Sequence, residues 1–247
     1  MEVQRYQVDV SLDELVRDTR LATEGWDWSR GAFGHALSLP ARHQLHPYSR
    51  NDYGNYPCAG VLDRCPGFRR LFDSLACEKV SFRLLRRGPG SSYSWHTDAW
   101  KGPGVARFQI PIISDDSAFL VITNYARVDQ LRGPVSGELD EDSLDAFARA
   151  NAGHFQKHHL EAGVLHYFPT NVVHTLVNPG PSERITLSFD LLANEWLLAR
   201  FPEVRREVGD HPARLPSPGR LLNGFARARS YLYPLRNRAR LRLHGES

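Results

Sequence analysis

The chain has 247 residues, of which 41% are hydrophobic and 24% are charged, and its formal net charge is +3. This length and composition are ordinary for a soluble globular protein with one large β-rich domain or two small ones, and no apolar run is long enough to span a membrane. The three cysteines, an odd number without C-x-x-C spacing, argue against a disulfide framework or a structural zinc site and fit a reducing cytoplasm.

The first third of the chain predicts two helices separated by irregular structure. Residues 1–16 carry acids and no apolar segment of the secretory type, so we expect a cytoplasmic protein. The segment Ser11–Glu14 is a capping-box pattern that predicts a short helix. Apolar residues recur at helical spacing from Pro66 to Cys77 and predict a second helix. Residues 25–60 are rich in Gly, Pro, His, Asn and Tyr, a composition that indicates loops.

From residue 80 onward the pattern changes to short β-prone runs. Strands are predicted at residues 80–85, 92–96, 107–113, 118–125, 164–168, 172–178 and 184–192. The last two runs flank the turn Pro179-Gly180-Pro181, so we expect them to form a hairpin-like pair. Many short strands between Gly and Pro turns predict a mainly β fold with flanking helices, of the sandwich or barrel type.

One helical insertion is predicted among these strands, at about residues 129–159. Its helix, from Leu139 to Ala152, begins with three acids, which favour a helix N-terminus. Leu144, Phe147 and Ala148 give the helix an apolar stripe. Long connections in compact domains are often binding loops, so the insertion is a candidate substrate lid. The alternative is a helix packed permanently on the outside of the barrel.

The C-terminal segment is strongly basic. Residues 200–247 hold eleven Arg and four acids, 11 − 4 = +7, whereas the remaining residues hold 20 Lys or Arg and 24 acids, 20 − 24 = −4. A basic arm for an anionic partner is one interpretation. However, leucines and aromatic residues are spread through the segment and it contains no Lys, which favours a docked, partly helical segment over a nucleic-acid-binding arm.

Three side chains in the strand region have the chemistry of a metal site. His96 and Asp98 lie two residues apart, and in a strand such residues point to the same face. His174 follows 78 residues later in another predicted strand. Two histidines and one carboxylate on a β-scaffold form the facial triad of non-haem Fe(II) oxygenases. Arg184, ten residues after His174, is placed to bind a carboxylate through its guanidinium fork.

Several motifs in the order of this chain resemble those of one known family. The motifs are HTD at 96–98, RFQIPI at 107–112 and AGVLHYFPTNVVHTLVNPGPSERITLSFD at 162–190. Together they resemble the aspartyl/asparaginyl β-hydroxylase family of Fe(II)/2-oxoglutarate-dependent dioxygenases, which includes bacterial hydroxylases of free proline. The match covers roughly residues 80–192. It rests on five features in the expected order, which are specific only in combination: His96, Arg107, Gly163, His174 with Asn178, and Arg184. Some members of this family lack the aspartate ligand, so the presence of Asp98 favours the small-molecule hydroxylases.

The resemblance implies a fold, three cofactors and a set of site residues. The fold is a double-stranded β-helix, a cupin-like jelly roll. Fe(II) would be held by His96, Asp98 and His174. Arg184 would bind the C5 carboxylate of the co-substrate 2-oxoglutarate, and O₂ would complete the reaction. Other candidate contacts to the co-substrate are Arg107, which could instead meet a substrate carboxylate, Thr186 and Ser188. Candidate substrate contacts are Trp95, Trp100, Tyr93 and His166; for the two tryptophans, ordinary packing in the core is an equal alternative.

We therefore expect one dioxygenase domain over residues 1–247. It would consist of N-terminal support in residues 1–79, a jelly-roll core in residues 80–192 and the basic segment in residues 193–247. The expected reaction is hydroxylation of an unactivated C–H bond of a free amino acid or a related small metabolite in a biosynthetic pathway.

Other functions remain open at this point. The same chemistry on a peptidyl or carrier-bound residue, and desaturation or cyclisation in place of hydroxylation, are alternatives. Halogenation is disfavoured because Asp98 occupies the position a halide would need. A non-catalytic cupin-like binding protein is disfavoured by the presence of Arg184. The sequence does not set the substrate or the oligomeric state.

Overall fold

A computed structural model describes residues 2–28, 36–46, 58–98, 104–132 and 141–209, and no side chain is described for residues 141–144. The chain divides into two compact units, Met1–Ala213 and Arg214–Ser247. The second unit lies outside the described residues, so the prediction of a docked basic segment stays a prediction for residues 210–247.

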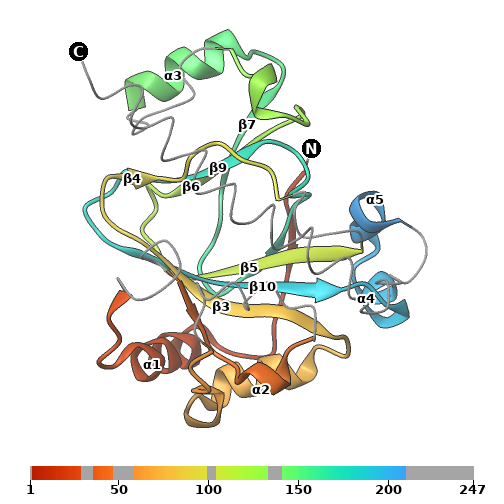
Figure 1. The fold of residues 1–247 in the computed structure, drawn as a ribbon. Helices are drawn as coiled ribbons and strands as arrows, with labels where there is room; N and C mark the ends of the chain where they lie inside the picture. The colour runs from red at the N-terminus through yellow and green to blue at the C-terminus, as the bar shows by residue number, and fades with distance from the viewer. Residues whose placement is uncertain (1, 29–35, 47–57, 99–103, 133–140, 210–247) are drawn as a thin grey trace, which may run out of the picture. The chain divides into compact units, whose positions relative to one another are not determined.

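The described residues form two antiparallel sheets (Figure 1). The order in the six-stranded sheet is β1 (Gln4–Tyr6), β8 (Leu165–Tyr167), β5 (Val105–Ile113), β10 (Arg184–Leu192), β3 (Lys79–Arg87) and β2 (Ala36–Ser38). The order in the four-stranded sheet is β4 (Ser91–Ser92), β9 (His174–Asn178), β6 (Phe119–Thr123) and β7 (Phe155–His159). From β3 to β10 the chain passes repeatedly from one sheet to the other, which is the topology of a jelly roll. The fold is therefore the predicted mainly β, cupin-like jelly roll with flanking helices.

Two helices cover the outer face of the six-stranded sheet (Figure 1). Helix α1 (Leu12–Thr23) begins at the predicted capping box of Ser11 and Glu14, and α2 (Pro66–Ser74) begins with a proline, whose missing N–H costs nothing in the first turn. Two short helices, α4 (Glu195–Arg200) and α5 (Arg205–Val208), follow β10. Single 3₁₀ turns lie at Arg42–Gln44, Leu62–Arg64, Val128–Gln130 and Pro202–Val204.

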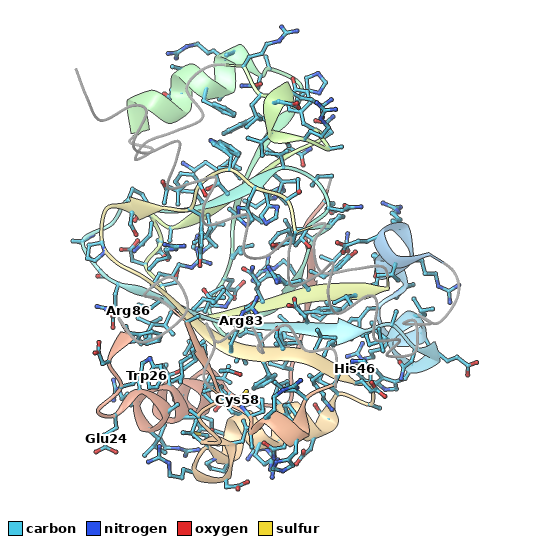
Figure 2. All side chains as sticks on the ribbon, in the orientation of Figure 1. Glu24, Trp26, His46, Cys58, Arg83 and Arg86 are labelled. Atoms are coloured by element: carbon cyan, nitrogen blue, oxygen red, sulfur yellow. The ribbon has the colours of Figure 1, made fainter. Side chains whose placement is uncertain are left out.

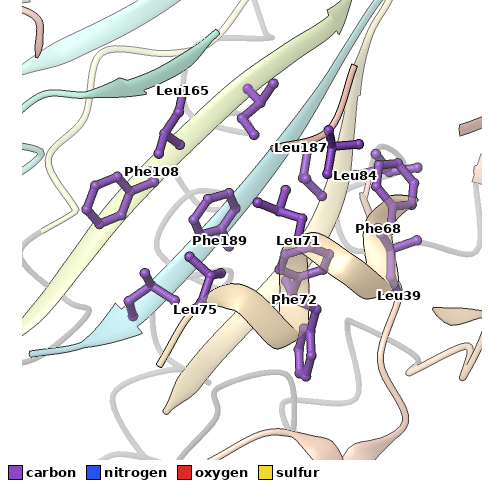
Figure 3. Close-up of a cluster of buried hydrophobic side chains, with 14 of the residues drawn as sticks. Leu39, Phe68, Leu71, Phe72, Leu75, Leu84, Phe108, Leu165, Leu187 and Phe189 are labelled. Carbon is purple, nitrogen blue, oxygen red and sulfur yellow. The ribbon is translucent and has the colours of Figure 1, made fainter. Parts of the chain in front are cut away.

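The strand alternation gives β10 one apolar and one polar face. Ile185, Leu187, Phe189 and Leu191 pack in the main core, together with Phe68, Leu71 and Phe72 of α2 (Figure 3). Burial of each such side chain stabilises the fold by about 1.5–3 kcal/mol. The alternate residues of the same strand point to the opposite, inner face of the sheet. They are Arg184, Thr186, Ser188 and Asp190, all buried.

The four-stranded sheet also has an outer cover, which is helix α3 (Glu141–Ala150) (Figure 1). Phe147 of α3 stacks on Trp95 with ring centroids 4.5 Å apart and belongs to a small apolar cluster with Phe119, Val121 and Val177. The apolar face of α3 therefore rests on the sheet itself, which favours the permanently packed helix over the predicted lid.

Two expectations about the strands are wrong in detail. The segment 172–178 and the segment 184–192 do not form a hairpin, because β9 pairs with β4 and β6 whereas β10 pairs with β3 and β5. The turn between them crosses from one sheet to the other. The predicted insertion at 129–159 also extends too far, since its last five residues form β7, which pairs with β6 along its whole length.

Cys58, Cys65 and Cys77 are free thiols. No helix within the described ranges is long and apolar enough to cross a lipid bilayer.

Candidate metal centre

The two histidines of the predicted triad are held together by their backbones. His96 and His174 form an antiparallel bridge in which each N–H donates to the carbonyl of the other, with N–O distances of 3.1 and 2.9 Å. Paired residues of antiparallel strands place their side chains on the same face. The two imidazole rings accordingly lie with centroids 4.4 Å apart.

Asp98 completes the group from the same segment as His96. Its backbone N–H donates to Thr170 O at 2.7 Å, which fixes the chain where it leaves the four-stranded sheet. Its Oδ1 lies 4.0 Å from His96 Nε2 and its Oδ2 3.6 Å from His174 Nε2. The three candidate ligand atoms all lie within 4.8 Å of one another. Sequence-predicted ligands 78 residues apart thus meet at one point.

The hydrogen bonds of the two imidazoles orient their other nitrogen towards this point. His96 Nδ1 lies 2.8 Å from Ser94 O, and His174 Nδ1 lies 2.9 Å from Val172 O. A carbonyl can only accept, so each Nδ1 carries the proton and each Nε2 keeps a lone pair. A backbone carbonyl on the distal nitrogen is the common support of a metal-binding histidine.

The electrostatics of the group also suit a divalent cation. Burial, followed by the neighbouring His174, lowers the pKa of His96 to about 4, so this ring is neutral at pH 7. Burial alone would raise the pKa of the Asp98 carboxyl, but Arg107 and the two histidines outweigh it and hold that pKa well below its usual range. The group therefore offers one carboxylate and the Nε2 atoms of two imidazoles, the donor set of a non-haem iron site.

Arg107 lies directly behind Asp98, and its partners differ from the sequence-based prediction. Its Nη1 donates to Asp98 Oδ2, while its Nε and Nη2 donate to the two oxygens of Asp190 at 2.7 and 2.9 Å. Arg107 was expected to contact a co-substrate or substrate carboxylate. In the structure its guanidinium is instead held between two protein carboxylates, both buried.

Arg184 presents the opposite situation. The side chain is 1% exposed, and its Nε donates to Thr186 Oγ1 at 3.3 Å. Neither Nη1 nor Nη2 hydrogen-bonds to any residue that the structure describes. Burial lowers the pKa of Arg184 to about 10, against a smaller opposite effect of Asp115, so the guanidinium is still charged at pH 7. A buried cation with two nitrogens that lack a hydrogen-bond acceptor destabilises the fold unless a ligand supplies the acceptor.

A row of polar side chains crosses the inner face between Arg184 and Arg107. The strand register places Ser188 of β10 opposite Gln109 of β5, and Gln109 opposite His166 of β8. Within the described residues, Ser188 Oγ, Gln109 Oε1 and His166 Nδ1 are buried without a hydrogen-bond partner. His166 Nε2 lies 3.1 Å from Glu161 O, and burial lowers the pKa of this ring to about 4. The interior next to the triad is therefore built for a polar ligand or ordered water.

A second arginine lies opposite Arg184 on this face. Arg87 is its cross-strand partner on β3 and lies over the ring of Tyr93, 3.0 Å from the ring centroid. Arg83 lies four residues before Arg87 on the same face of β3, and its Nη2 is 3.6 Å from an oxygen of Asp190 (Figure 2). Arg86 points to the other face of β3 and pairs with Glu183 at 2.7 Å (Figure 2). Arg83, Arg87, Arg107 and Arg184 therefore all place a positive charge on the inner face of the sheet.

The predicted substrate contacts fall into three groups. Trp95 lies on the outer side of the four-stranded sheet with Phe147, on the opposite face from His96, and its role as a substrate contact stays a prediction. Tyr93 lies beside His96 with ring centroids 5.8 Å apart, and His166 lies in the inner row. Trp100 lies outside the described residues. Tyr93 and His166 stay predictions as substrate contacts.

Two residues of this site were missed by the sequence analysis. Asp190 shares the inner face with Arg184, Thr186 and Ser188, and Gln109 shares it with Arg107. A signal for both was present in the strand period of two, since each lies two residues from a predicted site residue. The strand pairing that joins Asp190 to Arg107 has no such signal.

The comparisons with known proteins give only distant similarities. No family model matches the chain, and no curated protein sequence matches it. Solved structures similar to it include a cupin domain from Bordetella pertussis Tohama I (17% identity, 47% of this chain and 84% of that chain, TM-score 0.29). A 2OG-Fe(II) oxygenase family oxidoreductase from Burkholderia pseudomallei (13%, 50% and 48%, 0.32) and the nickel complex of the non-haem monooxygenase ThoJ (15%, 98% and 95%, 0.41) are others.

At these TM-scores the similarities carry no residue-level information. The jelly-roll assignment rests on the strand order of this chain, and the candidate metal site rests on its own geometry. The resemblance to the aspartyl/asparaginyl β-hydroxylases stays a prediction, because no family model supports it.

Proposed function

We propose that this protein is an Fe(II)- and 2-oxoglutarate-dependent oxygenase that hydroxylates an unactivated C–H bond of a small polar molecule, such as a free amino acid. The observation that carries the proposal is the presence of a metal-competent triad together with a buried guanidinium whose Nη1 and Nη2 have no hydrogen-bond partner among the described residues. His96, Asp98 and His174 would hold the metal, and Arg184 would hold the co-substrate.

Two observations support a metal at this site: the types of ligand atom, and the hydrogen bonds that already orient the two histidines. The Nε2 lone pairs of both histidines face Asp98, and both Nδ1 atoms are already bonded to carbonyls. Three protein ligands leave further positions on a six-coordinate ion for co-substrate and O₂. When bound, Fe(II) and 2-oxoglutarate supply the activation of O₂ and the transfer of oxygen to the substrate.

The fit of 2-oxoglutarate is supported by Arg184. A carboxylate can accept two parallel hydrogen bonds from Nη1 and Nη2, the two atoms without a partner among the described residues. Thr186 orients the guanidinium through Nε, and Ser188 offers a free hydroxyl one strand step further along. Arg87 adds a second positive charge opposite Arg184, which favours a dianion over a neutral ligand.

The chain's own residues would bind, orient and exclude water. The two sheets bury the triad from behind, where Phe168 lies edge-on to His174 with ring centroids 5.6 Å apart. Gln109 and His166 offer further hydrogen-bonding atoms on the inner face of the six-stranded sheet, which suits a substrate with polar groups. Tyr93, beside His96, is the aromatic residue placed to meet a substrate at the histidine side.

Succinate formation tests the proposal. The purified protein would be incubated with Fe(II), ascorbate, O₂ and 2-oxoglutarate, alone and with a library of amino acids and related metabolites. We expect slow succinate release without substrate and a several-fold rise with the true substrate, accompanied by a product 16 Da heavier. The His174→Ala variant serves as the inactive control. Succinate release that is equal in wild type and control would contradict the proposal.

A further inference from the structure

The geometry around Arg107 suggests a role that differs from binding a ligand. Asp190 is the cross-strand neighbour of Arg107, and the two side chains form a bidentate pair at 2.7 and 2.9 Å. The third nitrogen of the guanidinium, Nη1, reaches Asp98 Oδ2. One planar group thus joins a candidate metal ligand on one strand connection to a carboxylate in the centre of the six-stranded sheet.

The Asp190 carboxylate is itself firmly held. Ser81 Oγ donates to its Oδ2 at 2.9 Å, and Arg83 Nη2 lies 3.6 Å from the same oxygen. The register of β10 against β3 shifts between Asp190 and Leu191, a local irregularity of the kind that re-aims a side chain. Asp190 is 3% exposed, so the network is shielded from solvent.

We propose that Asp190 and Arg107 are positioning residues that orient Asp98 towards His96 and His174. A guanidinium has a fixed planar fork, so its bidentate pair with Asp190 sets the direction in which Nη1 points. Asp98 then has one oxygen committed to Arg107, while its other oxygen, Oδ1, lies on the side of His96. This inference rests on the proposed metal site and goes beyond it, since it gives a role to two residues that are not among the three candidate metal ligands.

The inference separates the inner arginines into two kinds. All three nitrogens of the Arg107 guanidinium donate to two protein carboxylates, whereas two nitrogens of Arg184 have no partner among the residues described. Loss of the Arg107–Asp190 pair should therefore weaken metal binding and leave 2-oxoglutarate binding unchanged. Loss of Arg184 should do the reverse.

Asp190→Asn tests this, because it keeps the shape of the side chain and removes one of its two acceptor oxygens. Co(II) binding by the metal-free protein would be measured by titration, together with the visible absorption of the bound ion, which reports ligand geometry. Removal of such a supporting partner typically weakens metal binding about 10–100-fold. We expect that loss and an altered Co(II) spectrum, with 2-oxoglutarate affinity at saturating metal within about twofold of wild type.

Glu183→Gln is the matched control, since it removes a carboxylate from an ion pair next to the start of the same strand, where its partner Arg86 points away from the inner face. It should leave the Co(II) affinity and spectrum unchanged. Arg107→Lys provides a second variant: it keeps the charge but cannot make three directed bonds, so we expect an intermediate loss of metal affinity. Near-UV circular dichroism checks that each variant is folded.

The outcomes are distinct. Wild-type Co(II) affinity and spectrum in folded Asp190→Asn and Arg107→Lys would contradict the positioning role and leave the metal site standing. A loss of 2-oxoglutarate affinity with normal Co(II) binding would show that Arg107 binds a ligand, and would also overturn the inference. No Co(II) binding by wild type, with no effect of His174→Ala, would contradict the proposed metal site itself.

Discussion

His96 and His174 exchange both of their backbone hydrogen bonds, although 78 residues separate them in the chain. This bridge pairs the first residue of β9 with the segment that follows β4. It sets the distance between the two rings before any metal binds. Because the backbone imposes the arrangement, the loss of one imidazole should remove a ligand without unfolding the sheet.

The first prediction follows from this bridge. His96→Ala, Asp98→Ala and His174→Ala should each abolish turnover and lower the affinity for Fe(II) or Co(II) by at least 100-fold, as expected for loss of one of three ligands. The free energy of unfolding of the metal-free His96→Ala and His174→Ala variants should lie within about 1 kcal/mol of the wild-type value, since the backbone pairing is kept. Metal titration and thermal unfolding of the three variants check this. Retention of tight binding in all three would contradict the triad.

The second prediction concerns Arg184, whose guanidinium is buried without a hydrogen-bonded partner for Nη1 and Nη2 in the described part of the chain. Arg184→Met should weaken 2-oxoglutarate binding by about 2–5 kcal/mol, the range for truncating a buried charge contact. The same change should leave the ligand-free protein as stable as wild type or stabilise it by about 1–3 kcal/mol, because an uncompensated buried charge is removed.

Calorimetry of 2-oxoglutarate binding and denaturant unfolding measure the two effects of Arg184→Met. Arg86→Met is the control, since Arg86 carries the same charge on β3 but pairs with Glu183 on the outer side. It should leave 2-oxoglutarate binding unchanged. Equal effects of the two variants would remove Arg184 from the site.

The third prediction is a pH dependence of stability in the metal-free protein. The pKa of His166 is lowered to about 4 in the folded protein, against an ordinary value of 6.5. Between pH 4 and pH 6.5, His166 is therefore more protonated in the unfolded chain than in the folded protein. The free energy of unfolding is highest above pH 6.5 and falls as the pH drops towards 4. A shift of this size corresponds to at most about 3 kcal/mol. His96, shifted in the same direction, adds to the effect.

Denaturant unfolding of wild type and His166→Gln between pH 4 and pH 7 measures this. The variant should lose part of the pH dependence, because one of the histidines with a lowered pKa is gone. Identical slopes for both proteins would show that His166 titrates normally in the folded state.

The fourth prediction addresses helix α3. Phe147 is fully buried against Trp95, and Asn151 ties the end of the helix to Arg132, with its Nδ2 2.8 Å from Arg132 O and its Oδ1 3.0 Å from Arg132 N. A helix held in this way is part of the scaffold. Amide exchange over Asp145–Ala150 should be slow in the free protein and unchanged by metal, 2-oxoglutarate and substrate. Phe147→Ala should cost about 3–5 kcal/mol of stability. Exchange that is fast in the free protein and slows with ligands would restore the lid.

Most of the strands and the grouping of the candidate metal ligands could be predicted from the sequence because both obey local rules. The alternation of residues 184–192 gave the polar face of β10, and the H-x-D spacing placed His96 and Asp98 together. The short β1 and β2 lack enough residues to show a period, and β7 is mostly polar because much of it is exposed. Three residues or a polar edge strand give no signal above that of a loop.

The order of strands within a sheet and the crossings between the sheets could not be predicted in the same way. The turn at Pro179-Gly180-Pro181 was visible, but its local chemistry does not tell whether the next strand returns to the same sheet or crosses to the other. For the same reason the partner of Arg107 was missed. Arg107 meets Asp190 only because β10 lies beside β5, which depends on the order of strands across the whole sheet.

The most direct test of the account is an anaerobic titration of 2-oxoglutarate into Fe(II)-loaded protein, followed by visible absorption and calorimetry. A metal held by His96, Asp98 and His174 with a co-substrate anchored at Arg184 predicts a saturable new absorption band and one molecule bound for each chain. The band should be absent in His174→Ala and should appear only at much higher 2-oxoglutarate concentration in Arg184→Met. Wild-type protein that binds Fe(II) but shows neither the band nor heat of 2-oxoglutarate binding would contradict the proposed function.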